Sequence, residues 1–182
     1  MNISHDEHPS AAIGSPCVGV VIPCFDEVTT ISSVIRLVLT RREVQEIIVV
    51  DDGSRDGTWE VLESLAAEEP RLQIVRHEQN RGKGAALRTG FAKVSAPIIL
   101  IQDADLEYDP MEYGTLLKPI VDEKADVVFG TRFRGAGAHR VLYFWHYVGN
   151  KTVTTISNIC TNLNLTDIEV GFKVFKTEII RK

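Results

Sequence analysis

Two aspartates, Asp103 and Asp105, stand one residue apart immediately after the apolar run 96–102. This run predicts a buried strand, and ligands of open α/β sheets usually bind outside the carboxyl ends of the strands. Carboxylate oxygens suit Mg²⁺ or Mn²⁺, which commonly bind few protein carboxylates and share the phosphates of a substrate. The pair therefore predicts a divalent cation site, although an isolated Asp-x-Asp is more often a solvated acidic turn.

Acidic residues also follow two other apolar runs. Asp51 and Asp52 end one of these runs, and an acid there could accept hydrogen bonds from a nucleotide base or ribose. Asp26 and Glu27 come directly after the expected strand 18–23. With the pair described above, three strand ends would converge on one acidic rim.

A glycine-rich segment around Lys83 contains Gly82 and Gly84. It is not a dinucleotide-binding fingerprint, because Leu87 replaces the third glycine and the segment does not follow the first strand. It is not a P-loop either, since no Ser or Thr follows the lysine. The segment predicts a helix start at which Arg81 and Lys83 could hold a phosphate, or glycines that serve tight packing alone.

Alternating strands and helices must hold these segments in place. Short β-branched runs predict strands at 18–23, 46–51, 72–75, 98–103 and 126–130. Between them, apolar residues recur at helical spacing, as in 28–39 and 83–94, and Thr58 is expected to begin another helix. This alternation favours an α/β fold with a mostly parallel sheet covered on both faces.

The composition is that of one soluble globular domain. The chain has 182 residues, of which 44% are apolar and 25% charged. Residues 1–16 are expected to form a disordered tail and 17–182 the domain. The net charge of −5 argues against general nucleic-acid binding. No apolar stretch approaches the ~18 residues of a membrane span, and the N-terminus lacks a signal-peptide pattern, so a cytoplasmic location is expected.

The cysteines and two of the histidines are expected to be chemically ordinary. Cys17, Cys24 and Cys160 lack the spacing of a zinc site or a disulfide framework, so we expect reduced, mostly buried thiols. His77 and His139 have no partner visible in the sequence, and both are expected at the surface.

The final third of the chain is basic and aromatic. Residues 127–166 contain no Asp or Glu, and six of the thirteen aromatic residues fall between 129 and 147. Cations beside aromatic residues mark surfaces that meet membranes or anionic apolar ligands. A core helix that carries a few surface cations would have the same composition, and the two interpretations are equally favoured.

Five motifs, in this order, resemble the family 2 glycosyltransferases of the GT-A fold. They extend over about residues 17–175 and read Val-Ile-Pro-Cys-Phe-Asp-Glu, Val-Val-Asp-Asp-Gly-Ser-Arg-Asp-Gly-Thr, Asn-Arg-Gly-Lys-Gly, Gln-Asp-Ala-Asp-Leu-Glu and Gly-Thr-Arg-Phe. Within the family they look most like dolichyl- and polyprenyl-phosphate mannosyl- and glucosyltransferases. The resemblance implies a three-layer α/β/α fold, and an inverting transfer of a sugar from a nucleotide diphosphate with Mg²⁺ or Mn²⁺ on the diphosphate.

The resemblance also implies roles for individual residues. The nucleotide sugar would contact Pro23, Phe25, Glu27, Asp51, Asp52, Lys83, Asp103 and Ala104. The metal ligands would be Asp103, Asp105 and Glu107, with Asp105 and Arg132 as catalytic residues. The acceptor phosphate would be held by Arg132, with Arg134, Arg140 and His146 as weaker candidates.

The resemblance and the basic aromatic stretch together favour transfer of a hexose, from GDP-mannose or UDP-glucose, to a polyprenyl or dolichyl phosphate. The protein would then be peripheral on the cytoplasmic face of a membrane. A phosphate with a second pKa of about 6 is largely ionised at neutral pH and needs no strong general base.

Two alternatives remain open. One is a family 2 transferase acting on a sugar hydroxyl, with Asp167 or Glu169 as the base. The other is an inactive nucleotide-sugar-binding module. Many members of the family continue past the position of Lys182 into further helices or membrane segments, so we expect a shortened or a minimal form of the domain.

Overall fold

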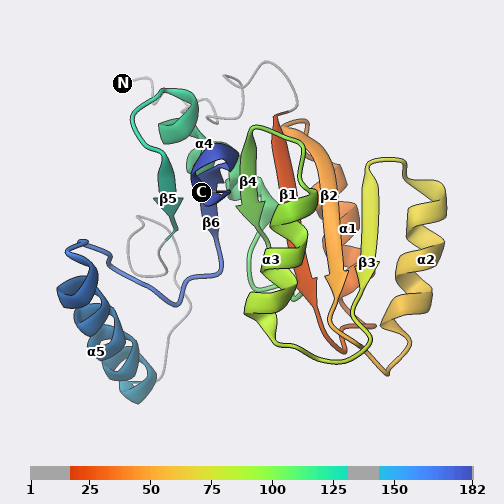
Figure 1. Ribbon diagram of the computed structural model, residues 1–182, viewed down its shortest axis with the longest axis horizontal. Coiled ribbons are helices and arrows are strands. Elements are labelled where there is room, and N and C mark those ends of the chain that lie inside the picture. The colour runs from red at the N-terminus through yellow and green to blue at the C-terminus, as the bar shows by residue number, and fades with distance from the viewer. Residues whose placement is uncertain (1–16, 131–143, 182) are drawn as a thin grey trace, which may run out of the picture.

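The computed structural model describes residues 17–130 and 144–181 as a three-layer α/β/α fold, as predicted. The middle layer is a six-stranded sheet in the order β3-β2-β1-β4-β6-β5 (Figure 1). The strands are β1 (Val18–Cys24), β2 (Val44–Asp51), β3 (Leu72–Arg76), β4 (Ile98–Ile101), β5 (Val127–Phe129) and β6 (Lys173–Lys176). The helices are α1 (Ile31–Leu39), α2 (Thr58–Glu68), α3 (Lys83–Lys93), the 3₁₀ helix η2 (Pro110–Glu112), α4 (Tyr113–Val121), α5 (Phe144–Thr161) and α6 (Thr177–Ile180).

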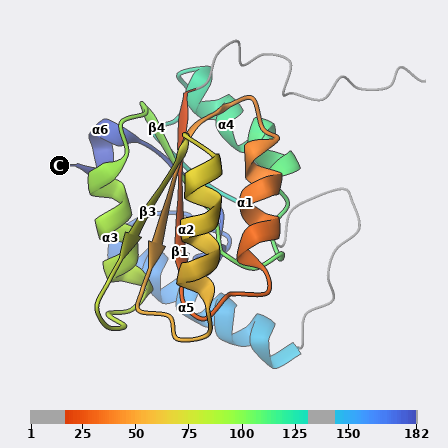
Figure 2. The ribbon, with the colours of Figure 1, turned by 90° about the vertical axis from the view of Figure 1, so that its right-hand side faces the viewer.

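Side chains of the central strands alternate between two core layers. Val20 and Ile22 pack in the layer that contains residues of α1, α2 and α4, whereas Val21 packs in the layer formed with α3 and α6. Figure 2 shows these two groups of helices on opposite sides of the sheet. Burial on both faces explains why β1, β2 and β4 are nearly continuous runs of valine, isoleucine and leucine.

Four neighbouring strands, β3, β2, β1 and β4, run parallel. Their carboxyl ends therefore meet at one edge of the sheet, which is where the sequence predicts the acidic rim. Strand β6 makes the sheet mixed, because it is antiparallel to both of its neighbours, β4 and β5. The sequence analysis predicted β5 but not β6, whose four residues are too few to show a clear period of two.

Helix α1 begins at Ile31, three residues later than the apolar pattern suggests. The N–H of Asp26 donates to Ser54 Oγ at 2.9 Å, and the N–H of Val28 donates to Asp56 Oδ2 at 3.0 Å. Residues 25–30 therefore form a loop that is bonded to the loop after β2. This tertiary contact overrides the local helical preference.

Helix α5 lies apart from both helical layers, on the side of the sheet where β5 and β6 lie (Figure 1). Only Asn150 and Thr154 of its residues are buried. Among the described residues, no helix has the length and the apolar character needed to cross a membrane. The expected tail 1–16 and His139 lie outside the described residues.

Candidate active site

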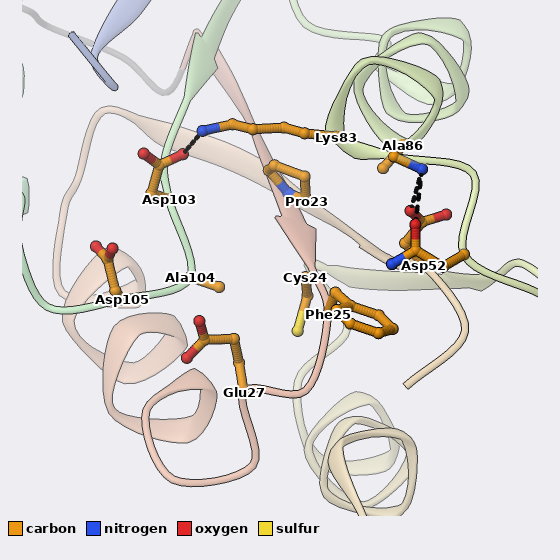
Figure 3. A pocket seen from close by; sticks show the side chains of 12 residues that line it. Pro23, Cys24, Phe25, Glu27, Asp52, Lys83, Ala86, Asp103, Ala104 and Asp105 are labelled. Atoms are coloured by element: carbon orange, nitrogen blue, oxygen red, sulfur yellow. Dashed lines mark hydrogen bonds and ion pairs between the residues drawn. The ribbon is translucent and has the colours of Figure 1, made fainter. Parts of the chain in front are cut away.

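A pocket of about 330 Å³ lies at the carboxyl ends of β1, β2 and β4. Its walls come from the loops after these strands and from the start of α3 (Figure 3). Most of the residues predicted to bind the nucleotide sugar line it. The lining residues are Pro23, Cys24, Phe25, Glu27, Asp52, Asn80, Gly82, Lys83, Ala86, Asp103, Ala104 and Asp105.

The loop after β1 is held by the loop after β2. The N–H of Asp26 donates to Ser54 Oγ at 2.9 Å, and the N–H of Glu27 donates to Thr58 Oγ1 at 3.0 Å. Asp26 Oδ1 in turn accepts from the N–H of Arg55 at 2.8 Å. Asp26 has a φ of 55°, a left-handed conformation that aspartate tolerates better than most residues. These bonds fix the loop that carries Glu27 into the pocket.

Asp52 joins the end of β2 to the glycine-rich segment. Its carboxylate accepts from the N–H of Arg81 at 3.0 Å and from the N–H of Gly82 at 2.7 Å, and Oδ1 lies 2.6 Å from Nδ1 of His77. Burial by itself raises the pKa of Asp52, but these donors together lower it below its usual value. Asp52 is therefore a carboxylate that fixes the turn before α3.

The predicted surface position of His77 is wrong. Its side chain is buried, with Nδ1 facing Asp52 and Nε2 lying 2.9 Å from Thr89 Oγ1 on α3. An ionised carboxylate can only accept hydrogen bonds, so Nδ1 carries the proton. The sequence does not reveal these partners, because the packing of α3 on the sheet brings them together.

Asp51 does not line the pocket. It is fully buried, its Oδ1 accepts from the N–H of Ser54 at 3.0 Å, and its Oδ2 lies 3.2 Å from Nε of Arg76. Successive residues of a strand point to opposite faces, so the neighbouring Asp52 takes the side that reaches the pocket. The geometry gives no support to the predicted contact between Asp51 and the nucleotide, and Asp51 instead braces the turn after β2.

Lys83 reaches across the pocket from the first turn of α3. Its Nζ lies 2.6 Å from Asp103 Oδ1, as Figure 3 shows. The lysine side chain is 57% exposed, so water screens this ion pair and a bound anion can replace it. Lysine and a helix start together suit a phosphate group at this wall of the pocket.

The sequence and the fold both place the chain among known proteins. Residues 19–182 match the family model described as Glycosyl transferase family 2. This chain belongs to that family. A polyprenol monophosphomannose synthase from Mycolicibacterium smegmatis is 30% identical over 167 residues, which are 90% of this chain and 63% of that protein. A UDP-N-acetylglucosamine–dolichyl-phosphate N-acetylglucosaminyltransferase from Methanococcus voltae is 26% identical and is matched over 88% of this chain and 70% of its own length.

Solved structures of glycosyltransferases share the fold of this chain. Mannosyltransferase PcManGT from Pyrobaculum calidifontis, in complex with GDP-Man and Mn²⁺, superposes with a TM-score of 0.66 at 22% identity, over 92% of this chain and 46% of that one. Glucosyl-3-phosphoglycerate synthase from Mycobacterium tuberculosis, in complex with Mn²⁺, UDP and phosphoglyceric acid, gives 0.70 at 24% identity, over 94% and 59%. The chain thus spans about half to two thirds of the length of these relatives.

The loop after β4 carries oxygen ligands that suit a metal ion. Asp103 and Asp105 line the pocket, whereas Glu107 is exposed and does not line it. Within residues 17–130 and 144–181, no three acidic, histidine or cysteine side chains are placed to hold one ion together. The predicted three-carboxylate site is therefore not preassembled. Two carboxylates still fit a hard cation whose other ligands are water and a diphosphate.

The sequence analysis missed four lining residues: Cys24, Asn80, Gly82 and Ala86. The last three belong to the glycine-rich segment, which it singled out only for Arg81 and Lys83. All three cysteines are free, but only Cys24 is buried, because Cys17 is half-buried and Cys160 is exposed, so the prediction of mostly buried thiols is wrong. Burial and then the charge of Asp51 raise the pKa of Cys24 to about 12. This thiol is therefore protonated and is not a nucleophile.

Of the four residues predicted to hold the acceptor phosphate, one lies in the described part of the chain. Arg132, Arg134 and Arg140 lie outside the described residues. His146 is exposed on α5 and does not line the pocket.

Asp167, the candidate base for a hydroxyl acceptor, is buried. Its Oδ1 accepts from Nδ2 of Asn150 at 2.8 Å and from the N–H of Glu169 at 3.1 Å. These bonds connect α5 to the segment before β6.

Proposed function

We propose that this transferase moves a hexose from GDP-mannose or UDP-glucose to a polyprenyl phosphate at a membrane surface. The observation that carries the proposal is one pocket in which the acidic loop after β4 faces Lys83 on α3. A site for a nucleotide diphosphate needs a cationic side chain on one side of the diphosphate. On the other side it needs carboxylates that hold a divalent cation against the phosphate oxygens.

The residues of the pocket divide the work on the donor. Phe25, 43% exposed beside the pocket, offers a ring against which a base can stack, and Asp52 keeps the neighbouring turn in place. Lys83 would turn from Asp103 to the diphosphate. A divalent cation, held by Asp103 and Asp105 with Glu107 nearby, would supply positive charge to the departing diphosphate.

Helix α5 supports a lipid acceptor. Its exposed apolar residues include Phe144, Trp145, Ile156 and Ile159, and Trp145 is 76% exposed. No acidic residue occurs in 127–166, so nothing in this stretch repels an anionic membrane surface. We propose that α5 lies against the membrane and that Arg132, Arg134 and Arg140 contribute to the phosphate site.

The buried position of Asp167 argues against this residue as the base for a hydroxyl acceptor, whereas Glu169, the other candidate, is exposed and its Oε2 accepts from Nδ2 of Asn150 at 3.0 Å. A general base must reach the proton that it removes, but the Asp167 carboxylate is already bonded to Asn150 and Glu169. A largely ionised phosphate needs no base, so the chain's part in the reaction would be to orient both substrates and to hold charge.

Transfer of labelled sugar to a short polyprenyl phosphate, with and without Mn²⁺, tests the proposal. We expect a metal-dependent lipid product from one donor of a UDP- and GDP-sugar panel. Asp105→Asn should lower the rate more than about tenfold, or ~1.4 kcal/mol of barrier. The control is Asp122→Asn, at the exposed end of α4.

Each unexpected result overturns a separate part of the proposal. If Asp105→Asn keeps more than a tenth of the rate, Asp105 is not a metal ligand. A labelled sugar in place of a labelled lipid would show that the acceptor is a hydroxyl. Binding of the donor without transfer to any acceptor would identify a nucleotide-sugar-binding module.

A further inference from the structure

A fully buried amide, Gln102, lies directly under the acidic loop. Its backbone N–H donates to the carbonyl of Val21 at 3.1 Å, which continues the pairing of β4 with β1 by one residue. The residue is therefore fixed to the centre of the sheet. The acidic loop begins at the next residue.

The side chain of Gln102 joins the two ends of this loop. Nε2 donates to the carbonyl of Asp103 at 3.1 Å and to the carbonyl of Tyr108 at 3.3 Å. Oε1 accepts from the hydroxyl of Tyr113, the first residue of α4, at 2.8 Å. Both N–H groups and the oxygen of the amide are thus satisfied, as a buried polar group requires.

The hydroxyl of Tyr113 remains a donor at any physiological pH. Burial raises the pKa of Tyr113 well above its usual value, and the ring is fully inaccessible. Protonation of Tyr113 therefore does not limit its bond to Gln102 in this pH range. A buried network in which every member is bonded is rigid, and it is costly to disturb.

A second contact holds the loop from the side. The N–H of Gly171 donates to the hydroxyl of Tyr108 at 2.9 Å, and the Tyr108 ring lies 4.9 Å from the ring of Phe172. These contacts fix one end of the loop. The Gln102 amide bonds to both ends, so it sets the distance between Asp103 and Tyr108.

We infer that Gln102, supported by Tyr113, is a positioning residue that sets the geometry of Asp103 and Asp105 for the divalent cation. The inference rests on the proposed function for the identity of that cation. Asp105 needs such support, because the bond that its carboxylate accepts from the loop is local: Oδ1 accepts from the N–H of Glu107 at 3.1 Å. The position of the Asp105 carboxylate therefore depends on the positions of the two loop ends that Gln102 holds.

The test compares Gln102→Met with Gln73→Met. The first change fills a similar volume and removes all three side-chain bonds, whereas Gln73 is exposed on β3, at the far edge of the sheet. Mn²⁺ binding is measured by electron paramagnetic resonance in the presence of UDP or GDP. Binding of each nucleotide without metal is measured in parallel.

Gln102→Met should weaken Mn²⁺ binding about tenfold, in the range found when outer-shell partners of metal ligands are removed. Nucleotide binding without metal should change less than about twofold, because Asp52 and Phe25 do not depend on this amide. Gln73→Met should match the unaltered protein in both measurements. Unchanged Mn²⁺ affinity in folded Gln102→Met would overturn the inference.

Two further measurements keep the inference testable in other cases. If Gln102→Met does not fold, Tyr113→Phe takes its place, and it should weaken Mn²⁺ binding in the same direction. If the unaltered protein binds no Mn²⁺ with either nucleotide, the metal part of the proposed function fails. In that case, amide hydrogen exchange of residues 103–112 tests whether Gln102 anchors the loop. Gln102→Met should speed the exchange about tenfold, and an unchanged rate would overturn the anchoring role.

Discussion

His77 Nδ1 lies 2.6 Å from Asp52 Oδ1, and both side chains are almost completely buried. The same carboxylate accepts from the backbone of Arg81 and Gly82, so one aspartate joins the end of β2, the end of β3 and the start of α3. The pocket wall that carries Lys83 therefore depends on a pair of residues that are 25 positions apart.

Replacing His77 should destabilise the protein and weaken donor binding together. His77→Ala leaves Asp52 without one donor and Thr89 without its partner, which should cost about 2 kcal/mol in the free energy of unfolding. Urea denaturation measures this loss, with Gln79→Ala as an exposed neighbouring control. Equal stability of the two variants would contradict a structural role for the His77–Asp52 pair.

Asp52 should contribute to the loss of stability in acid. Its pKa in the folded protein is below the ordinary value of 3.8, so its contribution is complete above that value. The contribution is lost as the pH falls below 3.8 through the lowered pKa. The slope of the unfolding free energy against pH gives the number of protons taken up on unfolding. In this pH range that number should be smaller in Asp52→Asn than in the unaltered protein, by up to one. Identical slopes would argue against the pKa shift.

Lys83 should matter for the donor and hardly for stability. Its ion pair with Asp103 is exposed, so Lys83→Met should change the unfolding free energy by less than about 0.5 kcal/mol. Affinity for the nucleotide sugar should fall about tenfold, because a charged contact to phosphate is lost. Calorimetric titration tests this, with Lys93→Met at the other end of α3 as the control. Donor affinity equal to that of the control would remove Lys83 from the phosphate site.

Gly171 should tolerate no side chain. A Cβ there would lie 2.6 Å from Asp103 Oδ2 and 2.6 Å from the Tyr108 ring. Gly171→Ala should therefore lower the melting temperature and push Asp103 out of place, with weaker Mn²⁺ binding as a result. Gly149→Ala is the matched control, since its Cβ would meet nothing within 4 Å and alanine favours the helix. Equal melting temperatures and equal Mn²⁺ affinities in the two variants would contradict the prediction and show that the loop can move to make room for a methyl group.

Local patterns in the sequence were enough to predict the fold class and the edge of the sheet at which the pocket lies. Apolar runs and helical periods are local patterns, and the carboxyl ends of parallel strands meet by geometry. This reasoning correctly placed Asp103, Asp105 and Glu27 at one pocket, and it made Lys83 a candidate for the same wall.

Tertiary structure alone decided which way individual side chains point and what they meet. Neighbouring aspartates separated at the end of β2, because Asp51 turned to Arg76 while Asp52 reached the pocket. The partners of His77 and Gln102, and the place of β6 between β4 and β5, came from packing between distant segments. Residue types limit which bonds a side chain can form, but the register of packed elements selects among them.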